Sequence, residues 1–203
     1  MPPTSLDLMA NPEPSKDEIR RDALARRNRL AADDRARRGA AVRRRFLRVA
    51  AVRRAHTLFC FASFRTEVDT AGILRWALRR GLVTAVPLIQ GPRRMVAVRI
   101  TDMSDLQPGQ WDIPEPRPGL PLVEPSSIDV AVLPGAAFDP QGGRVGYGGG
   151  FYDTFMRGLA PGAARIALAF DDQVIGCVPC EAHDLRAHMI VTERRVLRCG
   201  RVC

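Results

Sequence analysis

The sequence predicts an α/β fold, with a single domain in which helices flank an open, mainly parallel sheet. Short continuous apolar runs, such as residues 57–62 and 129–133, have the composition of strands that are buried on both faces. Between these runs lie segments whose apolar residues recur at helical spacing. Strands that alternate with helices favour parallel pairing, which gives a Rossmann-like three-layer arrangement. A chain of 203 residues is long enough for one hydrophobic core of ordinary size.

The first residues of the chain differ in composition from the rest. Residues 1–14 contain four prolines and little that could be buried, which predicts a disordered N-terminal tail. The single α/β domain is therefore expected to cover residues 15–203.

Two helices are expected after this tail. Ser15 and Glu18 have the spacing of a capping box, so the first helix should begin there. We expect it to run to Arg38, because Gly39 offers a stop. A second helix is predicted over residues 40–54, with apolar side chains on one face and most of the arginines on the opposite, solvated faces.

The remainder alternates between strands and helices. Helices are expected from Asp69 to Gly81 and over residues 151–159. Strands are expected at residues 57–62, 83–88, 95–100, 129–133, 165–170 and, last, 189–192. The proline-rich stretch 104–127 is predicted to be a long loop.

The net charge of +9 is concentrated near the N-terminus. Residues 1–56 hold one lysine, 14 arginines and seven acidic residues, a balance of +8. Such a segment can attract nucleic acid, an anionic membrane or a polyanionic small molecule, and charge alone does not choose among them. Lys16 is the single lysine beside thirty arginines, which suggests that a lysine is required at that position.

Neither a membrane segment nor a disulfide framework is expected. No apolar run approaches the roughly 20 residues that cross a bilayer, and the polar N-terminus lacks the apolar centre of a signal peptide, so we expect a cytoplasmic protein. Five cysteines are an odd number and do not suggest a disulfide framework. The spacing of Cys177, Cys180, Cys199 and Cys203 only approaches that of a zinc site, and we expect no zinc there.

The most informative segment is a glycine loop, residues 142–153, in which six of twelve residues are glycine. Glycines let backbone N–H groups approach a ligand closely, and a helix N-terminus favours anions. The loop follows a predicted strand and precedes a predicted helix, so we expect a phosphate site beyond the carboxyl ends of the strands. It is neither a Walker A loop, which needs Gly-Lys-Ser/Thr, nor a dinucleotide fingerprint, which needs a later acidic residue.

These residues resemble the 5-formyltetrahydrofolate cyclo-ligase family, also called methenyltetrahydrofolate synthetases. The resemblance is carried by Leu-Pro-Gly-Ala-Ala-Phe-Asp at 133–139 and by Gly-Arg-Val-Gly-Tyr-Gly-Gly-Gly-Phe-Tyr-Asp at 143–153. Weaker motifs of the family occur in the same order, at residues 16–20, 67–70, 111–116 and 183–184. Together they cover residues 15–193.

The resemblance implies an ATP-dependent ligase. It would convert 5-formyltetrahydrofolate, with or without a polyglutamate tail, to 5,10-methenyltetrahydrofolate, with Mg²⁺ bound and with release of ADP and phosphate. A formamide is a poor electrophile, so phosphorylation of the formyl oxygen would precede attack by N10. The protein would mainly align the reactants and neutralise charge. We expect it to act as a monomer.

The resemblance also assigns roles to residues, position by position. Catalytic roles fall on Arg144 and Tyr152. The implied ATP-binding residues are Lys16, Arg20, Arg144, Val145, Gly146, Tyr147, Gly148, Gly149, Gly150, Phe151 and Tyr152. The implied folate-binding residues are Ala62, Glu67, Trp111, Tyr147, Gly148, Gly149, Gly150 and Phe151. Asp153 and Asp184 are the implied Mg²⁺ ligands, and carboxylate oxygens suit that ion.

Two other functions stay open. Thr154 and His188 depart from the family pattern, which leaves room for a relative that acts on a different substrate. The basic helices could instead form a nucleic-acid-binding module. No recognition motif accompanies the run Arg43-Arg44-Arg45, and we expect a solvated helix face there.

Overall fold

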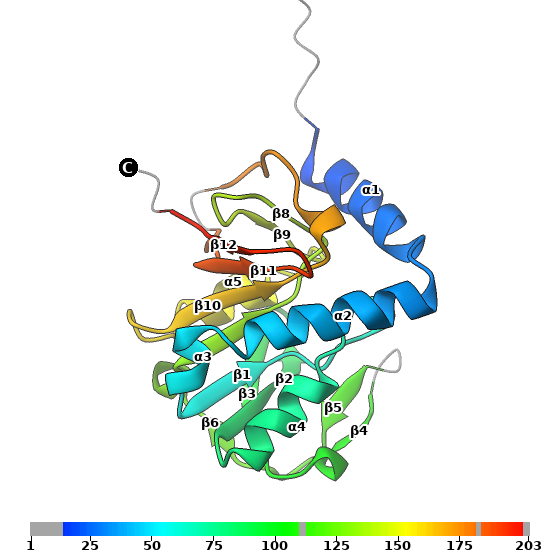
Figure 1. Ribbon diagram of the computed structural model, residues 1–203. Coiled ribbons are helices and arrows are strands. Elements are labelled where there is room, and N and C mark those ends of the chain that lie inside the picture. Colours follow the sequence, from blue (N-terminus) through cyan, green and yellow to red (C-terminus); the bar gives the residue numbers. More distant parts are fainter. Residues whose placement is uncertain (1–13, 110–112, 182–183, 201–203) are drawn as a thin grey trace, which may run out of the picture.

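The computed structural model describes residues 14–109, 113–181 and 184–200. The predicted N-terminal tail lies, except for Pro14, outside these described residues. Within them, an eight-stranded sheet forms the middle of the molecule, in the order β12-β11-β10-β7-β1-β2-β3-β6 (Figure 1). Its strands are β1 (Thr57–Cys60), β2 (Val83–Gly91), β3 (Arg94–Ile100), β6 (Leu122–Val123), β7 (Val130–Leu133), β10 (Ala164–Leu168), β11 (Met189–Val191) and β12 (Val196–Arg198).

The five central strands, from β11 to β2, run parallel to one another. The outer strands β12, β3 and β6 are antiparallel to their neighbours. The prediction of an α/β fold with a mainly parallel sheet is therefore confirmed.

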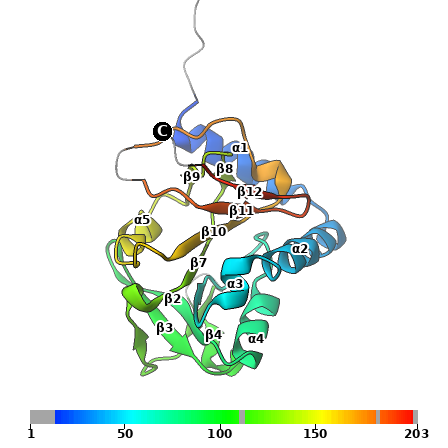
Figure 2. The ribbon, with the colours of Figure 1, turned by 60° about the vertical axis from the view of Figure 1, so that its left-hand side comes forward.

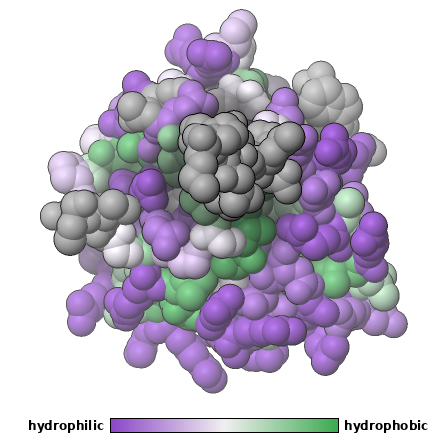
Figure 3. Space-filling view, turned by 90° about the horizontal axis from the view of Figure 1, so that it is seen from above, coloured by the Kyte–Doolittle hydropathy of each residue, from purple (hydrophilic) through white to green (hydrophobic). Residues whose placement is uncertain are grey.

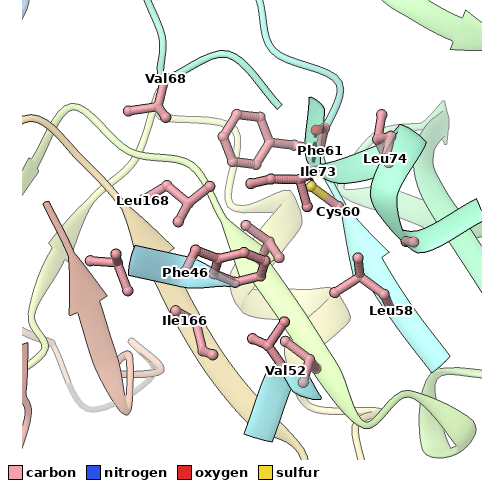
Figure 4. Close-up of a cluster of buried hydrophobic side chains, with 14 of the residues drawn as sticks. Phe46, Val52, Leu58, Cys60, Phe61, Val68, Ile73, Leu74, Ile166 and Leu168 are labelled. Atoms are coloured by element: carbon pink, nitrogen blue, oxygen red, sulfur yellow. Dashed lines mark hydrogen bonds between the residues drawn. The ribbon is translucent and has the colours of Figure 1, made fainter. Parts of the chain in front are cut away.

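Helices cover both faces of this sheet. They are α1 (Lys16–Asn28), α2 (Ala32–Phe46), α3 (Ala50–Arg54), α4 (Ala71–Arg79) and α5 (Phe151–Met156). Successive residues of β1 point to opposite faces. Leu58 packs with Phe46 of α2 and Ile73 of α4 (Figure 4). Phe59, in contrast, packs with Phe155 of α5. Helices α2, α3 and α4 thus form one outer layer, and α5 lies on the other side (Figure 2).

Helix α1 stands apart from these layers. It begins with the expected capping box between Ser15 and Glu18. Its Ile19 and Ala23 pack against Ala137 and Val145, in the hairpin of β8 (Ala137–Phe138) and β9 (Arg144–Val145). Because this hairpin leads into the glycine loop, α1 is fixed beside that loop (Figure 1).

The predicted boundary between the first two helices is wrong. Helix α1 ends at Asn28 rather than at Arg38, and Gly39 lies inside α2. Gly39 is buried in the helix, and a Cβ atom there would be in ordinary contact, 3.9 Å from the backbone nitrogen of Asp69, so the glycine neither ends the helix nor is required by its packing. Two acidic residues in the first turn of α2, Asp33 and Asp34, favour a helix start there.

The predicted long loop over residues 104–127 is also wrong. It contains the hairpin of β4 (Leu106–Pro108) and β5 (Pro114–Pro116), and β6, which pairs with β3. Strand β12 follows what was predicted to be the last strand. Segments of two or three residues are too short to show a periodicity, so their pairing partners decide their conformation.

The order of the strands creates a switch point in the sheet. From β1 the chain crosses through α4 to β2 on one side, and from β7 it crosses through α5 to β10 on the other. The segments that leave the adjacent strands β1 and β7 therefore diverge. In open α/β sheets such a crevice is the usual place for a ligand.

Candidate active site

A narrow pocket lies at this switch point, and its walls approach so closely that it has no room for a water molecule. Phe61 and Glu67 line it from the segment after β1, and Pro134 and Gly135 line it from the segment after β7. The segment after β1 is held in shape by Thr70, whose hydroxyl donates to the carbonyl oxygen of Phe61 at 2.7 Å. The sequence thus folds two loops into the walls of one site.

Cations of α1 face the glycine loop. Lys16 Nζ donates to Asp184 Oδ2 at 2.6 Å and to Glu181 Oε1 at 2.8 Å. Arg20 Nε donates to the carbonyl oxygen of Gly146 at 2.7 Å. Burial alone would lower the pKa of Lys16, but its hydrogen bonds to the two carboxylates outweigh this and raise it. Lys16 therefore carries its charge throughout the physiological range. Figure 3 looks down on this end of the molecule, where hydrophilic residues dominate the visible surface.

Arg144 is the most deeply buried cation of the loop. Only 5% of its side chain is exposed, and its Nη2 atom donates to Asp153 Oδ2 at 2.8 Å. Its Nε atom is buried and has no hydrogen-bond partner among the described residues. A Cβ atom on Gly146 would lie 2.8 Å from Arg144 Nη1, so the loop can pass this closely only with glycine there. A buried N–H group without a partner at this position is suited to donate a hydrogen bond to an oxygen atom of a ligand.

The helix after the loop contributes little positive charge of its own. Gly150 caps α5 in the left-handed conformation, with φ of 66°, as the predicted strand-loop-helix pattern requires. However, α5 has only six residues. The positive character of the site comes from Lys16, Arg20 and Arg144.

The remaining residues of the predicted ATP loop differ in exposure. Val145 is buried under α1, Gly148, Gly149 and Gly150 are exposed, and Phe151 is half-buried. Tyr152 packs beside Phe59, and the Arg144 guanidinium lies 5.7 Å from the centre of its ring. Burial raises the pKa of the Tyr152 phenol well above its usual value, so the ring is neutral beside the cation.

The predicted folate residue Glu67 belongs to a second cluster. Its Oε2 atom accepts the backbone N–H of Phe64 at 2.9 Å, and its Oε1 atom accepts the hydroxyl of Tyr147. Arg27 Nη1 donates to the same hydroxyl oxygen at 2.8 Å. Burial raises the pKa of Glu67, and these hydrogen bonds act against that rise. Ala62 is buried just beyond β1, and Trp111 lies outside the described residues.

The two predicted metal ligands are brought close together. Leu185, next to Asp184, donates its backbone N–H to Asp153 Oδ1 at 3.4 Å. Asp184 Oδ2 also accepts the backbone N–H of Glu181 at 2.9 Å. Among the described residues, no group of three or more histidine, cysteine or acidic side chains could hold a metal. Two carboxylates nevertheless fit Mg²⁺, which takes few protein ligands and completes its shell with phosphate oxygens and water.

Three residues of this site were missed from the sequence. Arg27 lies eleven positions after Lys16, within about 40° of Lys16 and Arg20 around the helix axis, so helical spacing could have found it. Glu181 binds Lys16, and nothing in the sequence marked it. Gln173 Nε2 donates to the carbonyl oxygens of Gly135 and Ala136 at 3.0 and 2.9 Å, and so holds the turn after β7.

The two departures from the family pattern lie in different places, Thr154 directly after Asp153 and His188 beside the sheet. Thr154 is exposed on α5. His188 Nδ1 accepts the backbone N–H of Arg165 at 3.2 Å, which joins the starts of β10 and β11. Cys177 and Cys180 are exposed and carry free thiols. In the part of the chain that is described, no helix is long and apolar enough to cross a membrane.

Known proteins resemble the whole of this arrangement. A family model for the 5-formyltetrahydrofolate cyclo-ligase family matches residues 12–193. The mouse 5-formyltetrahydrofolate cyclo-ligase is 26% identical over 190 residues, which cover 88% of this chain and 94% of the mouse protein. The Escherichia coli K12 5-formyltetrahydrofolate cyclo-ligase is 30% identical over 146 residues, covering 70% and 80%.

Solved structures agree with these sequence matches. The 5,10-methenyltetrahydrofolate synthetase of Aquifex aeolicus has a TM-score of 0.80 at 27% identity, covering 93% of this chain and 95% of the other. That of Mycoplasma pneumoniae has a TM-score of 0.73 at 16% identity over 88% and 98%, a likeness of fold alone. The fold, the glycine loop and the match over residues 12–193 lead to one conclusion: this chain belongs to the 5-formyltetrahydrofolate cyclo-ligase family.

Proposed function

We propose that this chain is an active cyclo-ligase, which converts 5-formyltetrahydrofolate to 5,10-methenyltetrahydrofolate while ATP becomes ADP and phosphate. The observation that carries the proposal is the set of cations around the glycine loop: Arg144 belongs to it, Arg20 bonds Gly146 in it, and Lys16 bonds Asp184, next to the residue that bonds Asp153. Anions of ATP suit this cation set.

The proposed reaction has two steps. The formyl oxygen attacks the γ-phosphorus of ATP, so an O–P bond forms while the bond to the β-phosphate oxygen breaks and ADP leaves. N10 then attacks the activated carbon, and the C–O bond breaks to release phosphate. No covalent protein nucleophile takes part. The protein lowers the barrier by alignment and by placing positive charge where negative charge develops.

Arg144 is the central catalytic residue of this proposal. Its unpaired Nε atom would donate to an oxygen of the phosphoryl group in transfer. The Tyr152 ring would hold the guanidinium in place from one side, as the Asp153 carboxylate does from another. Lys16, Arg20 and the loop up to Tyr152 would hold the rest of the ATP phosphates.

Asp153 and Asp184 would hold Mg²⁺ together with oxygens of ATP. The ion would neutralise part of the phosphate charge. On the folate side, Glu67 would accept N–H donors of the pterin ring, with Ala62, Tyr147, Gly148, Gly149, Gly150 and Phe151 around it. Trp111 would stack on the ring. We further propose that the chain works in the cytoplasm as a monomer, on free or polyglutamylated folate.

The test is a direct assay of both products. Protein is mixed with Mg-ATP and 5-formyltetrahydrofolate, the methenyl product is followed by its absorbance band, and ADP is measured in parallel. We expect one ADP for each methenyl product and no ring closure when ADP replaces ATP. Ring closure at an undiminished rate without nucleotide would rule out the phosphorylation step.

A nucleic-acid-binding role is the second candidate, because several exposed arginines on α2, α3 and α4, among them Arg44, Arg53 and Arg75, have no acidic partner among the described residues. A salt-sensitive mobility shift without folate-dependent ATP turnover would favour that role over the first.

A further inference from the structure

We infer that Arg27 is a positioning residue of the folate subsite, which acts through Tyr147 to hold the Glu67 carboxylate where it receives the N–H donors of a pterin. This inference rests on the proposed function, because it takes Glu67 as the group that binds the pterin.

The burial of Arg27 requires an explanation. Only 5% of the residue is exposed, although it belongs to the second half of a helix with a mostly polar surface. A buried guanidinium is costly unless it is well hydrogen-bonded. Among the described residues Arg27 makes no ion pair; its bonds go from Nη1 to the Tyr147 hydroxyl at 2.8 Å and from Nε to Thr66 Oγ1 at 3.0 Å.

These bonds connect three separate segments. Arg27 is part of the rigid helix α1, Thr66 and Glu67 belong to the loop after β1, and Tyr147 belongs to the glycine loop. The Tyr147 hydroxyl accepts from Arg27 and donates to Glu67. A hydroxyl that accepts from a cation becomes a better donor, so the chain Arg27–Tyr147–Glu67 strengthens its own last link.

Tyr147 is the most exposed member of this chain. Its residue is 48% exposed and lies in a glycine-rich loop, while its hydroxyl is enclosed between Arg27 and Glu67. A tyrosine in such a loop would take several positions without an anchor. The Arg27 guanidinium is that anchor, since it combines the hydroxyl bond with a cation–π contact at 5.9 Å from the ring centre.

The narrow pocket beside this chain would have to widen to admit a ring, but its walls combine apolar side chains with polar groups. Arg27 and Glu67 line it together with the apolar side chains Phe61, Val68 and Leu168. Apolar walls suit the faces of a pterin ring, and an acceptor carboxylate suits its N–H edge. Glu67 can accept both ring donors only while it is ionised and correctly turned.

The charge of Arg27 favours the ionised form of Glu67. Burial raises the pKa of Glu67, while the Tyr147 hydroxyl, the Phe64 N–H and the Arg27 charge lower it. The other titratable group near it is Tyr152, and both phenols are neutral because burial raises their pKa values. Removal of the Arg27 charge therefore raises the pKa of Glu67 further. A larger fraction of the Glu67 carboxyl is then protonated at a given pH. As the pH is lowered, the variant therefore loses folate binding at a higher pH than wild type does.

The experiment compares Arg27→Gln with Arg26→Gln, which removes an exposed arginine one position away on the same helix. Equilibrium binding of 5-formyltetrahydrofolate is measured without ATP across the acid pH range, and KM values for folate and ATP are measured in the assay. Arg27→Gln is expected to weaken folate binding roughly tenfold, the lower end for a hydrogen bond to a charged group. The acid limb of the binding profile, the pH range over which folate binding is lost on acidification, should lie at higher pH in this variant. KM for ATP should stay within about twofold of wild type. Arg26→Gln is expected to match wild type.

Two more variants separate positioning from folding. Arg27→Lys retains the charge, so it should return the acid limb towards that of wild type even where affinity is only partly restored. Tyr147→Phe breaks the link at a half-exposed side chain and should also weaken folate binding, without loss of melting temperature. This second variant keeps the test valid if Arg27→Gln does not fold.

The outcomes distinguish this inference from the proposed function. If wild-type protein binds folate but does not close the ring, the proposed function fails and the binding comparison still decides the role of Arg27. Suppose that wild type closes the ring, and that Tyr147→Phe and Arg27→Gln bind folate with the affinity and pH profile of wild type. In that case only the inference about Arg27 is wrong. Equal losses for ATP and folate, or no folate binding by wild type, would also overturn it.

Discussion

Two regions of this molecule are rich in cations, and they differ in what those cations face. Lys16, Arg20 and Arg27 form one line on α1, and each bonds to a polar group in a loop beside the sheet. The second region is the basic face, the set of exposed arginines on and after α2, α3 and α4. It consists of Arg44, Arg48, Arg53, Arg54, Arg75, Arg79 and Arg80.

The arginines of the basic face have no acidic partner among the described residues, and three of them line a surface groove with His56 near the starts of β1 and β2. The pocket of the site lies beyond the opposite end of β1, between the segments that follow β1 and β7. Both regions are rich in arginine, so the presence of positive charge does not distinguish them. The difference is that the cations of the site are partly buried and fixed by bonds to loops, and fixed charges are the ones that bind a phosphate specifically.

The largest effect is expected from Arg144, the buried cation of the glycine loop. Arg144→Lys keeps the charge but loses the fork that bonds Asp153 and carries the unpaired Nε atom. We expect kcat to fall about 10²- to 10³-fold, the usual loss when a donor to the transition state is removed. Steady-state kinetics with both substrates saturating measures this.

Arg117→Lys is the control for this variant, because it alters another arginine–aspartate pair, with Asp105 at 2.6 Å, outside the site. It should leave kcat unchanged. A kcat close to that of wild type in Arg144→Lys would show that Arg144 is a structural partner of Asp153 and has no role in phosphoryl transfer.

Lys16 tests whether the helix start binds nucleotide. Loss of a charge-assisted hydrogen bond costs about 1.5–3 kcal/mol, so Lys16→Gln should weaken ATP binding roughly 10- to 150-fold with little change in melting temperature. The matched control is Arg21→Gln, which removes an exposed charge from the same helix. ATP titration of both variants measures this. Equal losses of ATP affinity in the two variants would show that the effect comes from total charge and not from a nucleotide site at Lys16.

A smaller effect is expected from Asp153→Asn. The amide keeps an oxygen that can accept from Arg144 but loses the negative charge that attracts Mg²⁺. The Mg²⁺ concentration for half-maximal rate should therefore rise severalfold while the fold is retained. Asp22→Asn, an exposed change on α1, serves as the control. If Asp153→Asn has the magnesium dependence of wild type, the carboxylate only orients Arg144.

The sequence predicted the parts of the fold that local patterns encode. Continuous apolar runs identified β1, β7 and β10, because strands buried on both faces admit few polar residues. It did not predict the β4–β5 hairpin or β12, whose two or three residues are held by pairing across the chain. Gly39 does not end a helix, because a glycine inside a helix costs only about 1 kcal/mol relative to alanine and the packing of α2 outweighs that cost.

The site was predictable where a motif is continuous. The glycine loop and its flanking Arg144 and Asp153 are contiguous in sequence, and the structure brings Lys16 and Asp184 together across 168 positions. Glu181 and Gln173 were not predictable, because each acts on a backbone or side chain that only the fold brings near. Arg27 was predictable in part, because helical spacing places it on the face of Lys16 and Arg20, but its bonds to Thr66 and Tyr147 depend on the fold.

The smallest effect is expected on the basic face itself. The triple variant Arg44→Gln/Arg53→Gln/Arg54→Gln removes three exposed charges; Arg43 is left in place because its side chain packs over Gly72 of α4. At 0.15 M salt the screening length is about 8 Å, so ATP affinity should change by less than about twofold. At 0.01 M salt the length grows to about 30 Å, and a modest loss of affinity for ATP and polyglutamylated folate should appear. The measurement is therefore a salt series of ATP titrations on this variant beside Lys16→Gln. If the triple variant still binds ATP more weakly at 0.15 M salt, an anion site lies on the basic face. If its loss of ATP affinity disappears at that salt concentration, the basic face acts only through long-range attraction. The loss of ATP affinity in Lys16→Gln should persist at both salt concentrations.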